Sequence, residues 1–307
     1  MRSLVLLLAA LPALAAVQVD NVLVKMVPPG TDSLLGGRMA ELKSTALFSK
    51  MMAAQKLPEL DKFAKETGFD LRTDVREVLF ASGPKGGVLL ARGKFAVKLS
   101  EVQGLKRVRH GQYNLYQMPT TGGNSGFCIL DQTLAAAGTM EALTAALDEW
   151  VSGQHTAAQP LLAKAAGISA KAQFWGISSG FASFVADHLP GMTSGNVDFS
   201  KIFRGVQDTW FDMDLSKGLK CEIHGTAANE KDAVSLRDAA KGLIGFGRLS
   251  VPEGQKELYR VWDGIEAEQQ GRNISIKADI EQGLLDKVVN LLQAMPAGPG
   301  RRATGKA

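Results

Sequence analysis

The chain has 307 residues, 45% of them hydrophobic, which is enough to bury one large core or two of ordinary size. Its net charge of +4 is accounted for by Arg2 near the start and by Arg301, Arg302 and Lys306 near the end. The rest of the chain is therefore neutral, which excludes the concentrated basic stripe that nucleic-acid binding requires.

Residues 1–15 have the layout of a secretory signal peptide. Arg2 precedes an apolar run, and Ala13 and Ala15 fit the small residues of a cleavage site. The run from Ser3 to Val17 is 15 residues long, shorter than the roughly 20 that span a bilayer, so an uncleaved membrane anchor is the weaker alternative. The sequence predicts cleavage near Ala16, a secreted or periplasmic location, and no transmembrane helix after signal removal.

The first half, residues 16–155, is predicted to alternate helices with antiparallel strands. Strand patterns cover 33–39, 106–118, 126–130 and 133–138, a hairpin covers 74–95, and helix patterns cover 40–55, 58–67, 98–105 and 140–150. The last of these helices has Met140, Leu143, Leu147 and Trp150 at helical spacing, which indicates one buried side.

The second half, residues 156–295, repeats this order of elements. We expect a strand at 172–178, a short helix at 180–189, hairpins at 206–227 and 258–280, and helices at 229–246 and 284–292. The glycine-rich stretch 242–247 predicts the end of the longer helix, since it lacks the lysine of a phosphate-binding loop.

The repeated order predicts an α+β fold of two tandem duplicated halves. Lys85-Gly86 and Lys217-Gly218 occupy equivalent hairpin turns at an offset of 132 residues. Each half is expected to have antiparallel β-hairpins with helices packed on one face of a sheet. The order of elements leaves open whether the two sheets are continuous. Residues 296–307 form a basic, Pro/Gly/Ala-rich tail that we expect to be disordered. A solubilising end is the favoured interpretation of this tail, and a weak contact with the cell envelope is the alternative.

The most specific catalytic pattern is the G-x-S-x-G sequence from Gly176 to Gly180, which is typical of serine hydrolases when it joins a strand to a helix. Ser178 would be the nucleophile, His224 the base, and Asp198, Asp208 or Asp212 the acid. The surrounding hairpins argue against this, because the hydrolase fold needs parallel strands. The competing interpretation is that Ser178 and Ser179 cap the helix that follows.

Metal and cofactor sites are not indicated. Asp212–Gly218 begins like a calcium loop but has Lys217 at the position that needs glycine and Ile223 at the position that needs glutamate. The four histidines are far apart, and no motif implies a cofactor. Cys128 and Cys221 allow one disulfide, but each lies in an apolar strand pattern where a buried free thiol is the commoner state.

One segment outside the serine motif combines the residue types of a binding surface. Residues 107–118, RVRHGQYNLYQM, interleave basic groups with Tyr113 and Tyr116, a mixture that can stack on sugars and pair with anions. Alternation of polar and apolar residues favours the simpler interpretation, a strand with one polar face.

The stretch LDKFAKETGFDLRTDVREVLFAS at 60–82, with VLLARGKF at 88–95, resembles uncharacterised secreted bacterial proteins that have two related α+β halves. This resemblance covers mainly the first half and brings no catalytic residues with it. It implies a non-catalytic binding or structural protein of the cell envelope. A secreted serine hydrolase using Ser178 and an envelope or lipid-binding module are the two alternatives.

Overall fold

The computed structural model of the chain describes residues 19–54, 61, 64–65, 68–96, 105–118, 124–180 and 205–294. The expected signal peptide, the tail 296–307, the helix 180–189 beyond its first residue, most of the helices 58–67 and 98–105, and Asp198 lie outside these residues. Within them, no helix is long and apolar enough to cross a membrane.

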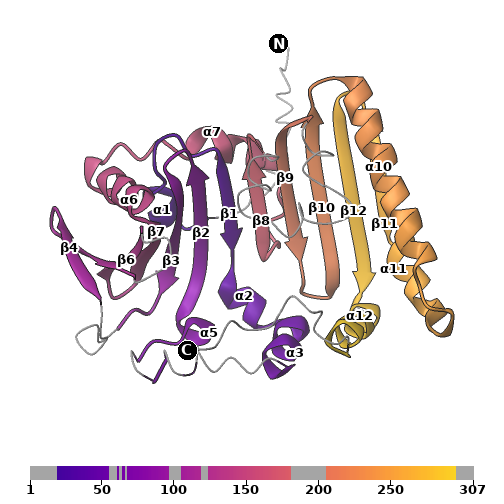
Figure 1. The fold of residues 1–307 in the computed structure, drawn as a ribbon, viewed down its shortest axis with the longest axis horizontal. Coiled ribbons are helices and arrows are strands. Elements are labelled where there is room, and N and C mark those ends of the chain that lie inside the picture. Colours follow the sequence, from indigo (N-terminus) through magenta and orange to yellow (C-terminus); the bar gives the residue numbers. More distant parts are fainter. Residues whose placement is uncertain are drawn as a thin grey trace, which may run out of the picture.

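The described strands form one twelve-stranded sheet in which every neighbouring pair is antiparallel (Figure 1). Their order is β11-β12-β10-β9-β8-β1-β2-β3-β7-β6-β5-β4. The strand bounds are β1 (Ser33–Gly37), β2 (Val75–Gly83), β3 (Gly86–Gly93), β4 (Lys106–His110), β5 (Tyr113–Gln117), β6 (Ser125–Asp131), β7 (Leu134–Thr139), β8 (Phe174–Ser178), β9 (Val206–Asp214), β10 (Gly218–Ala227), β11 (Ile265–Gln270) and β12 (Asn273–Glu281). The chain is therefore α+β, as the alternating patterns predicted.

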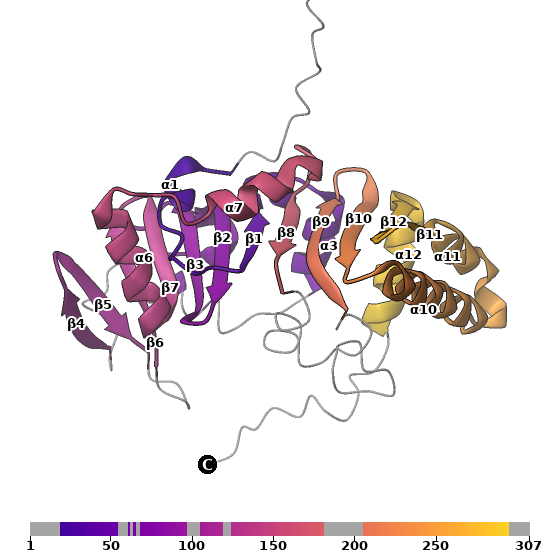
Figure 2. The ribbon, with the colours of Figure 1, turned by 90° about the horizontal axis from the view of Figure 1, so that it is seen from above.

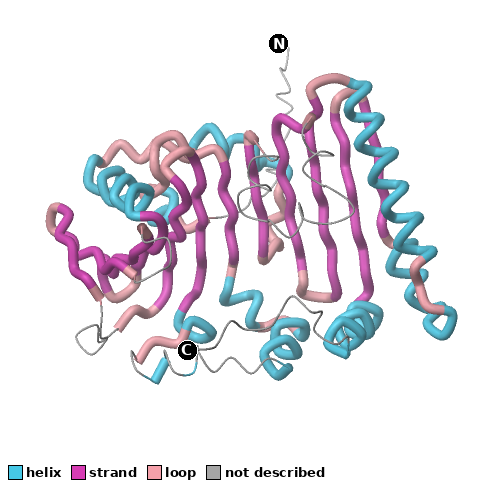
Figure 3. Tube along the Cα trace, viewed as in Figure 1, coloured by secondary structure: helices cyan, strands magenta, loops and turns pink. Residues whose placement is uncertain are grey.

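Helices occupy both ends and both faces of the sheet (Figure 3). They are α1 (Asn21–Val24), α2 (Met39–Lys43), α3 (Ala46–Ala54), α5 (Leu71–Asp74), α6 (Met140–Ser152), α7 (Gln159–Leu162), α10 (Glu230–Leu249), α11 (Tyr259–Asp263) and α12 (Gln282–Ala294), with 3-10 turns η2 (Ala163–Gly167) and η4 (Glu253–Leu258). Thr139 caps α6 by accepting from the Ala142 N–H, and Asn229 caps α10 by accepting from the Asp232 N–H. The two closing helices, α6 and α12, confirm the periodicity seen in the sequence.

The two halves share one sheet because β1 pairs with β8, from Ser33 opposite Ser178 to Gly37 opposite Phe174. Gly36 lies opposite Trp175, and the indole ring occupies the space that a side chain at Gly36 would need. Trp175 is 2% exposed. The junction between the halves is thus a buried strand pair and not a linker.

The two main helices cover opposite faces of this sheet. Cross-strand partners project to the same face, so Leu34, Ile177, Leu79 and Leu90 share one face, where they form a core with α6. On β10 and β12 the alternate residues, among them Ile274, contact α10. Figure 2 shows α6 and α7 on one side of the sheet and α10 on the other. We call these sides the α6 face and the α10 face.

One tertiary contact overturns two predictions from sequence. The helix predicted to stop in the glycine-rich stretch continues through it to Leu249, and the start of the predicted strand at 258 is helical, as α11. Gly247 packs directly against the ring of Trp262, which leaves no room for a side chain there. Packing of α11 on α10 therefore outweighs both the low helix propensity of glycine and the strand-like composition of 258–264.

A third correction concerns residues 106–118, predicted as one strand. They form the hairpin β4–β5, which turns at Gly111 with a φ of 55°. Glycine readily adopts that left-handed conformation, which allows the turn. The alternation of polar and apolar residues is the same on either side of Gly111, so the pattern does not reveal where the first strand ends. The hairpins β2–β3 and β9–β10 were predicted correctly, and so was the hairpin β11–β12 from Ile265 onward.

The disulfide between Cys128 and Cys221 does not form, since both thiols are free. They lie on β6 and β10, with β9, β8, β1, β2, β3 and β7 between them in the sheet. At about 4.8 Å per strand this is a separation of roughly 34 Å, far beyond the reach of a disulfide. Burial raises the pKa of each thiol to about 11, so both are unreactive near neutral pH.

Replacing Gly36 by alanine should destabilise the fold by about 1–3 kcal/mol, because the added methyl group overlaps the indole of Trp175. The matched control is Gly283→Ala in α12, where nothing lies near the added atom and alanine favours the helix by up to about 1 kcal/mol. Urea unfolding followed by circular dichroism measures both. Equal stability of the two variants would contradict the buried junction.

Candidate functional site

Ser178 is the last residue of β8 and is buried, with 5% of its surface exposed. Its Oγ lies 2.8 Å from Ser33 Oγ, and Ser33 Oγ donates to Asp32 Oδ1 at 2.9 Å. Ser33 has a single proton to give, so Ser178 is the donor in the first bond. The Ser178 hydroxyl is thus bonded to another hydroxyl and not to a base, and it lacks the exposure that a nucleophile at a strand-to-helix turn requires.

Ser178 belongs to a row of hydroxyl groups that crosses four strands on the α10 face. Ser82, Ser33, Ser178 and Thr209 are successive cross-strand partners on β2, β1, β8 and β9, and each is less than a tenth exposed. Thr209 Oγ1 has no hydrogen-bond partner among the described residues. The serine of the motif is therefore one member of a buried polar row at the junction of the halves.

His224 projects from the opposite face. Ile177 pairs with Trp210, and Trp210 pairs with His224, which places all three on the α6 face, while Ser178 pairs with Thr209 on the α10 face. The hypothesis that Ser178 and His224 act together is therefore wrong, because a sheet separates their side chains. Among the predicted acids, Asp208 and Asp212 lie on the same face as His224, and Asp198 is outside the described residues.

The His224 ring stacks on Trp210 with 3.9 Å between ring centroids and 16° between planes. His224 Nε2 lies 3.1 Å from Glu222 Oε2, two residues earlier on β10. Burial acts to raise the pKa of Glu222, but the contact with His224 and the charge of Lys277 outweigh it and lower that pKa. The stack is therefore a fixed aromatic surface with a carboxylate beside it.

The serine that meets charged groups is Ser179. Its Oγ donates to Asp208 Oδ1 at 2.9 Å and accepts from Lys164 Nζ at 2.8 Å, and Lys164 is 2.6 Å from the same carboxylate oxygen. Burial acts to raise the pKa of Asp208, but Lys164 and Ser179 outweigh it and hold that pKa below its ordinary value. The Lys164 ammonium group has no lone pair with which to take a proton, and a carboxylate with a lowered pKa is a weak base for a serine hydroxyl.

Trp210 and His224 border a pocket of about 220 Å³ on the α6 face, which we call the Trp210–His224 pocket. Lys164, Asp208, Thr226 and Asn273 supply its polar wall, and Thr226 Oγ1 donates to Asn273 Oδ1 at 3.0 Å. The volume exceeds the about 150 Å³ that holds a benzene ring in an engineered cavity. The sequence did not indicate Lys164 or the contacts of Ser179, because only the tertiary structure shows that Ser179 and not Ser178 meets the Lys164 and Asp208 side chains of this pocket.

The segment that resembled a calcium loop is used for backbone contacts. Asp212 accepts from the Ser169 N–H at 2.7 Å, and Asp214 accepts from the Ser216 N–H and hydroxyl. Within the described ranges no three metal-binding side chains converge on one point. The hairpin tip is therefore held by its own hydrogen bonds.

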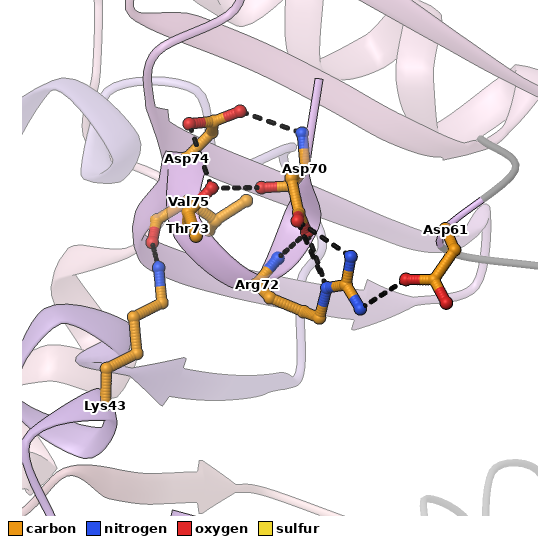
Figure 4. Close-up of polar contacts among 7 residues, drawn as sticks. All are labelled: Lys43, Asp61, Asp70, Arg72, Thr73, Asp74 and Val75. Atoms are coloured by element: carbon orange, nitrogen blue, oxygen red, sulfur yellow. Dashed lines mark hydrogen bonds and ion pairs between the residues drawn. The ribbon is translucent and has the colours of Figure 1, made fainter. Parts of the chain in front are cut away.

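The residues that carry the family resemblance have structural roles in the described part of 60–82 (Figure 4). Asp70 caps α5 by accepting from the Arg72 N–H, and the Arg72 guanidinium contacts both Asp70 and Asp61. Hydrogen bonding from Arg72 lowers the pKa of Asp70 below its ordinary value. Lys43 of α2 donates to the Val75 carbonyl at the start of β2. This cluster fixes the entry into β2 and points to no ligand.

Comparison with known proteins assigns no family to the chain. No family model and no curated protein matches it. A solved structure, crystal form I of TP0453, is similar with a TM-score of 0.47 and 12% identity, over 90% of this chain and 98% of that one. Function must therefore be inferred from the described residues themselves.

Stability at neutral pH should rise when Asp212 is replaced by asparagine. Burial raises the pKa of Asp212, and the Glu222 carboxylate adds to the effect. Because its pKa is raised, Asp212 holds its proton more tightly in the folded protein than in the unfolded chain. Its contribution to stability is therefore present at low pH and is lost as the pH rises above the ordinary value of 3.8. The variant keeps an acceptor for Ser169, so its melting temperature should exceed that of the wild type at pH 7 and approach it near pH 3.

Asp214→Asn provides the control of opposite sign. Burial opposes ionisation of Asp214, but the bonds from Ser216 prevail and lower its pKa, so its contribution to stability is present at neutral pH and lost in acid. This variant should melt below the wild type at pH 7. If both variants shift in the same direction, the assignment of the two carboxylates is incorrect.

Proposed function

We propose that this protein is an exported, non-catalytic binding protein whose ligand occupies the Trp210–His224 pocket. The single observation that carries this is the combination in one pocket of a stacked aromatic pair with the Lys164–Asp208 ion pair and the hydroxyl groups beside it. An aromatic surface with hydrogen-bonding groups of both polarities suits a small polyhydroxylated molecule such as a sugar. Among the residues that the structure describes, Ser178 has no base beside it, and the carboxylate that accepts from Ser179 is paired with Lys164 and has a lowered pKa, which makes it a weak base.

Export is the second part of the proposal. Its support is the layout of residues 1–15, and a contact of the basic tail 296–307 with anionic envelope polymers would fit the same location. The resemblance of 60–82 to secreted bacterial proteins agrees with it.

We further propose that the two halves arose by duplication. Outward from the junction the strand order is β1, β2, β3, β7, β6 on one side and β8, β9, β10, β12, β11 on the other, so both halves share a single strand and two hairpins in the same order, and the first half adds the hairpin β4–β5 at its outer edge. The first hairpin of each half also has a register shift, at Val75/Glu77 and at Thr226/Ala227. The shared irregularity supports common ancestry over independent folding of similar elements.

A lipid-binding role has one observation in its favour, an apolar pocket under α10 lined by Val206, Ile223, Leu236, Leu243 and Ile274 among others. Its volume is about 70 Å³, half of the about 150 Å³ that holds one benzene ring. This is too small for an acyl chain without movement of α10, so the polar pocket is the better site. Lipid recovered by solvent extraction of the purified protein would reverse that preference.

Sugar binding is tested by saturation-transfer NMR with glucose, galactose, N-acetylglucosamine and glucuronate as probes. We expect at least one of these sugars to bind. The double variant Asp208→Asn with Lys164→Met should weaken that binding by about tenfold, since neither side chain can then form a charge-assisted hydrogen bond with the sugar. The matched control removes the exposed Lys220–Asp279 pair from the same face. Absence of binding by all four sugars, or equal losses in the two double variants, would contradict the proposal.

A fluorophosphonate probe tests the non-catalytic part separately. Ser178 is buried and Ser179 faces an ion pair, so neither should be labelled under conditions that label a serine hydrolase completely. Labelling of either serine that Ser178→Ala or Ser179→Ala abolishes would establish the hydrolase instead.

Export predicts a shortened protein. When the full chain is produced in a bacterium, the intact mass of the protein recovered outside the cytoplasm should correspond to a start near Ala16, and Ala15→Arg should block this cleavage because the site requires a small residue. Recovery of the uncleaved chain from the cytoplasm alone would refute export.

A further inference from the structure

The β4–β5 hairpin turns away from the rest of the sheet at its outer end (Figure 1). Only Tyr116 and Gln117 of β5 pair with β6, opposite Phe127 and Gly126. β4 is the edge strand, and four of its five residues are exposed. Within the described part of the chain, no strand pairs with the outer edge of β4 and one face of the hairpin is uncovered.

Strand register sorts its side chains between two faces. Val108 pairs with Leu115, which is fully buried in the core with α6. Arg107 pairs with Tyr116 and Arg109 with Asn114, so both arginines project from the other face, beside Tyr116. Successive residues of one face are about 6.7 Å apart along a strand. The arginines thus form a short row of two guanidinium groups.

An aromatic pair adjoins this row. Tyr116 stacks on Phe127 with 5.3 Å between ring centroids and 21° between ring planes, and both rings are half-buried. Phe127 is the cross-strand partner of Tyr116 and so lies on the same face as the arginines. Flat apolar rings and two guanidinium groups therefore share one open surface.

The positive charge of this face is not neutralised by any described carboxylate. Among the described residues, no carboxylate lies within ion-pair distance of Lys106, Arg107 or Arg109, and the one bond from the Arg109 side chain goes to the Gly111 carbonyl. On the other face of the hairpin, by contrast, His110 meets Asp148 at 2.7 Å. The arginines keep their capacity to bind an external anion.

We propose that this surface, Arg107, Arg109, Tyr116 and Phe127, binds an acidic polysaccharide made of uronic-acid sugars. A guanidinium group matches a carboxylate with two parallel hydrogen bonds, and aromatic rings accept the apolar face of a sugar ring. The site is separate from the Trp210–His224 pocket, since it lies at the other end of the sheet and on the α10 face. It extends the function from a small ligand to a polymer.

A nucleic-acid site and a protected sheet edge would each behave differently from a polysaccharide site. A nucleic acid engages a longer row of cations than the two arginines on this face, since non-specific binding rests on several neutralised phosphates. Charged residues also protect sheet edges from pairing with other chains, in which case no ligand would bind and their loss would cause self-association.

The test uses the full chain, with polygalacturonate as the probe and neutral dextran as the reference, measured by isothermal calorimetry at low salt. Arg107→Gln with Arg109→Gln should weaken polygalacturonate binding by about tenfold or more. The matched control, Arg248→Gln with Arg260→Gln, removes the same charge from exposed positions on α10 and α11 and should change binding less than twofold. Tyr116→Leu should also weaken binding without changing its salt dependence, because it removes the stacking surface and no charge.

Circular dichroism and size-exclusion chromatography confirm that each variant folds. No binding of polygalacturonate by the wild type, equal binding of dextran, or equal loss in both double variants would overturn the proposal. Tighter binding of single-stranded DNA than of polygalacturonate would assign the surface to phosphate. Self-association of the Arg107/Arg109 variant without any loss of binding would assign it to edge protection.

Discussion

Five residue pairs join β1 to β8, two strands that are more than a hundred residues apart in sequence and belong to different halves of the chain. Because side chains alternate between faces along a strand, the register of this pairing determines which face every residue of β8 and β9 occupies. A shift of one residue would exchange Ser178 with Ser179 and would move Trp175 out of the core. The packing of Trp175 against Gly36 favours this register, since the indole occupies the space that a side chain at position 36 would need.

The chemistry of the candidate site follows from this register. Ser178 is directed to the α10 face, where Ser33 and Thr209 surround it, while Ser179 is directed to the α6 face and meets Lys164 and Asp208. The Trp210–His224 stack lies on that second face beside them. A motif typical of hydrolases is therefore split between two surfaces, and what remains on the α6 face is a polar and aromatic pocket suited to binding.

Placing α6 and α10 on opposite faces explains why both halves keep open surface. On β10 and β12 the α6 face carries Glu222, His224 and Lys277, so it stays hydrated, while the apolar residues contact α10. At the other end of the sheet, α6 covers the side of Leu115, and the arginines of β4 face away from it. Both proposed binding surfaces are the faces that the long helices leave uncovered.

The period-two and helical patterns by themselves determined the elements: three of the hairpins, the closing helices α6 and α12, and an antiparallel α+β fold were predicted because side-chain periodicity is a local property. Residues 106–118 were misread as one strand because alternation continues through the turn at Gly111. The extension of α10 through Gly247 was missed because it depends on contact with Trp262. Lys164 lies in an alanine-rich stretch with no pattern, and the sequence could not show that it reaches Ser179. Strand order, register and the choice of face involve residues distant in the chain, so only the tertiary structure decided which serine, which histidine and which arginines share a surface.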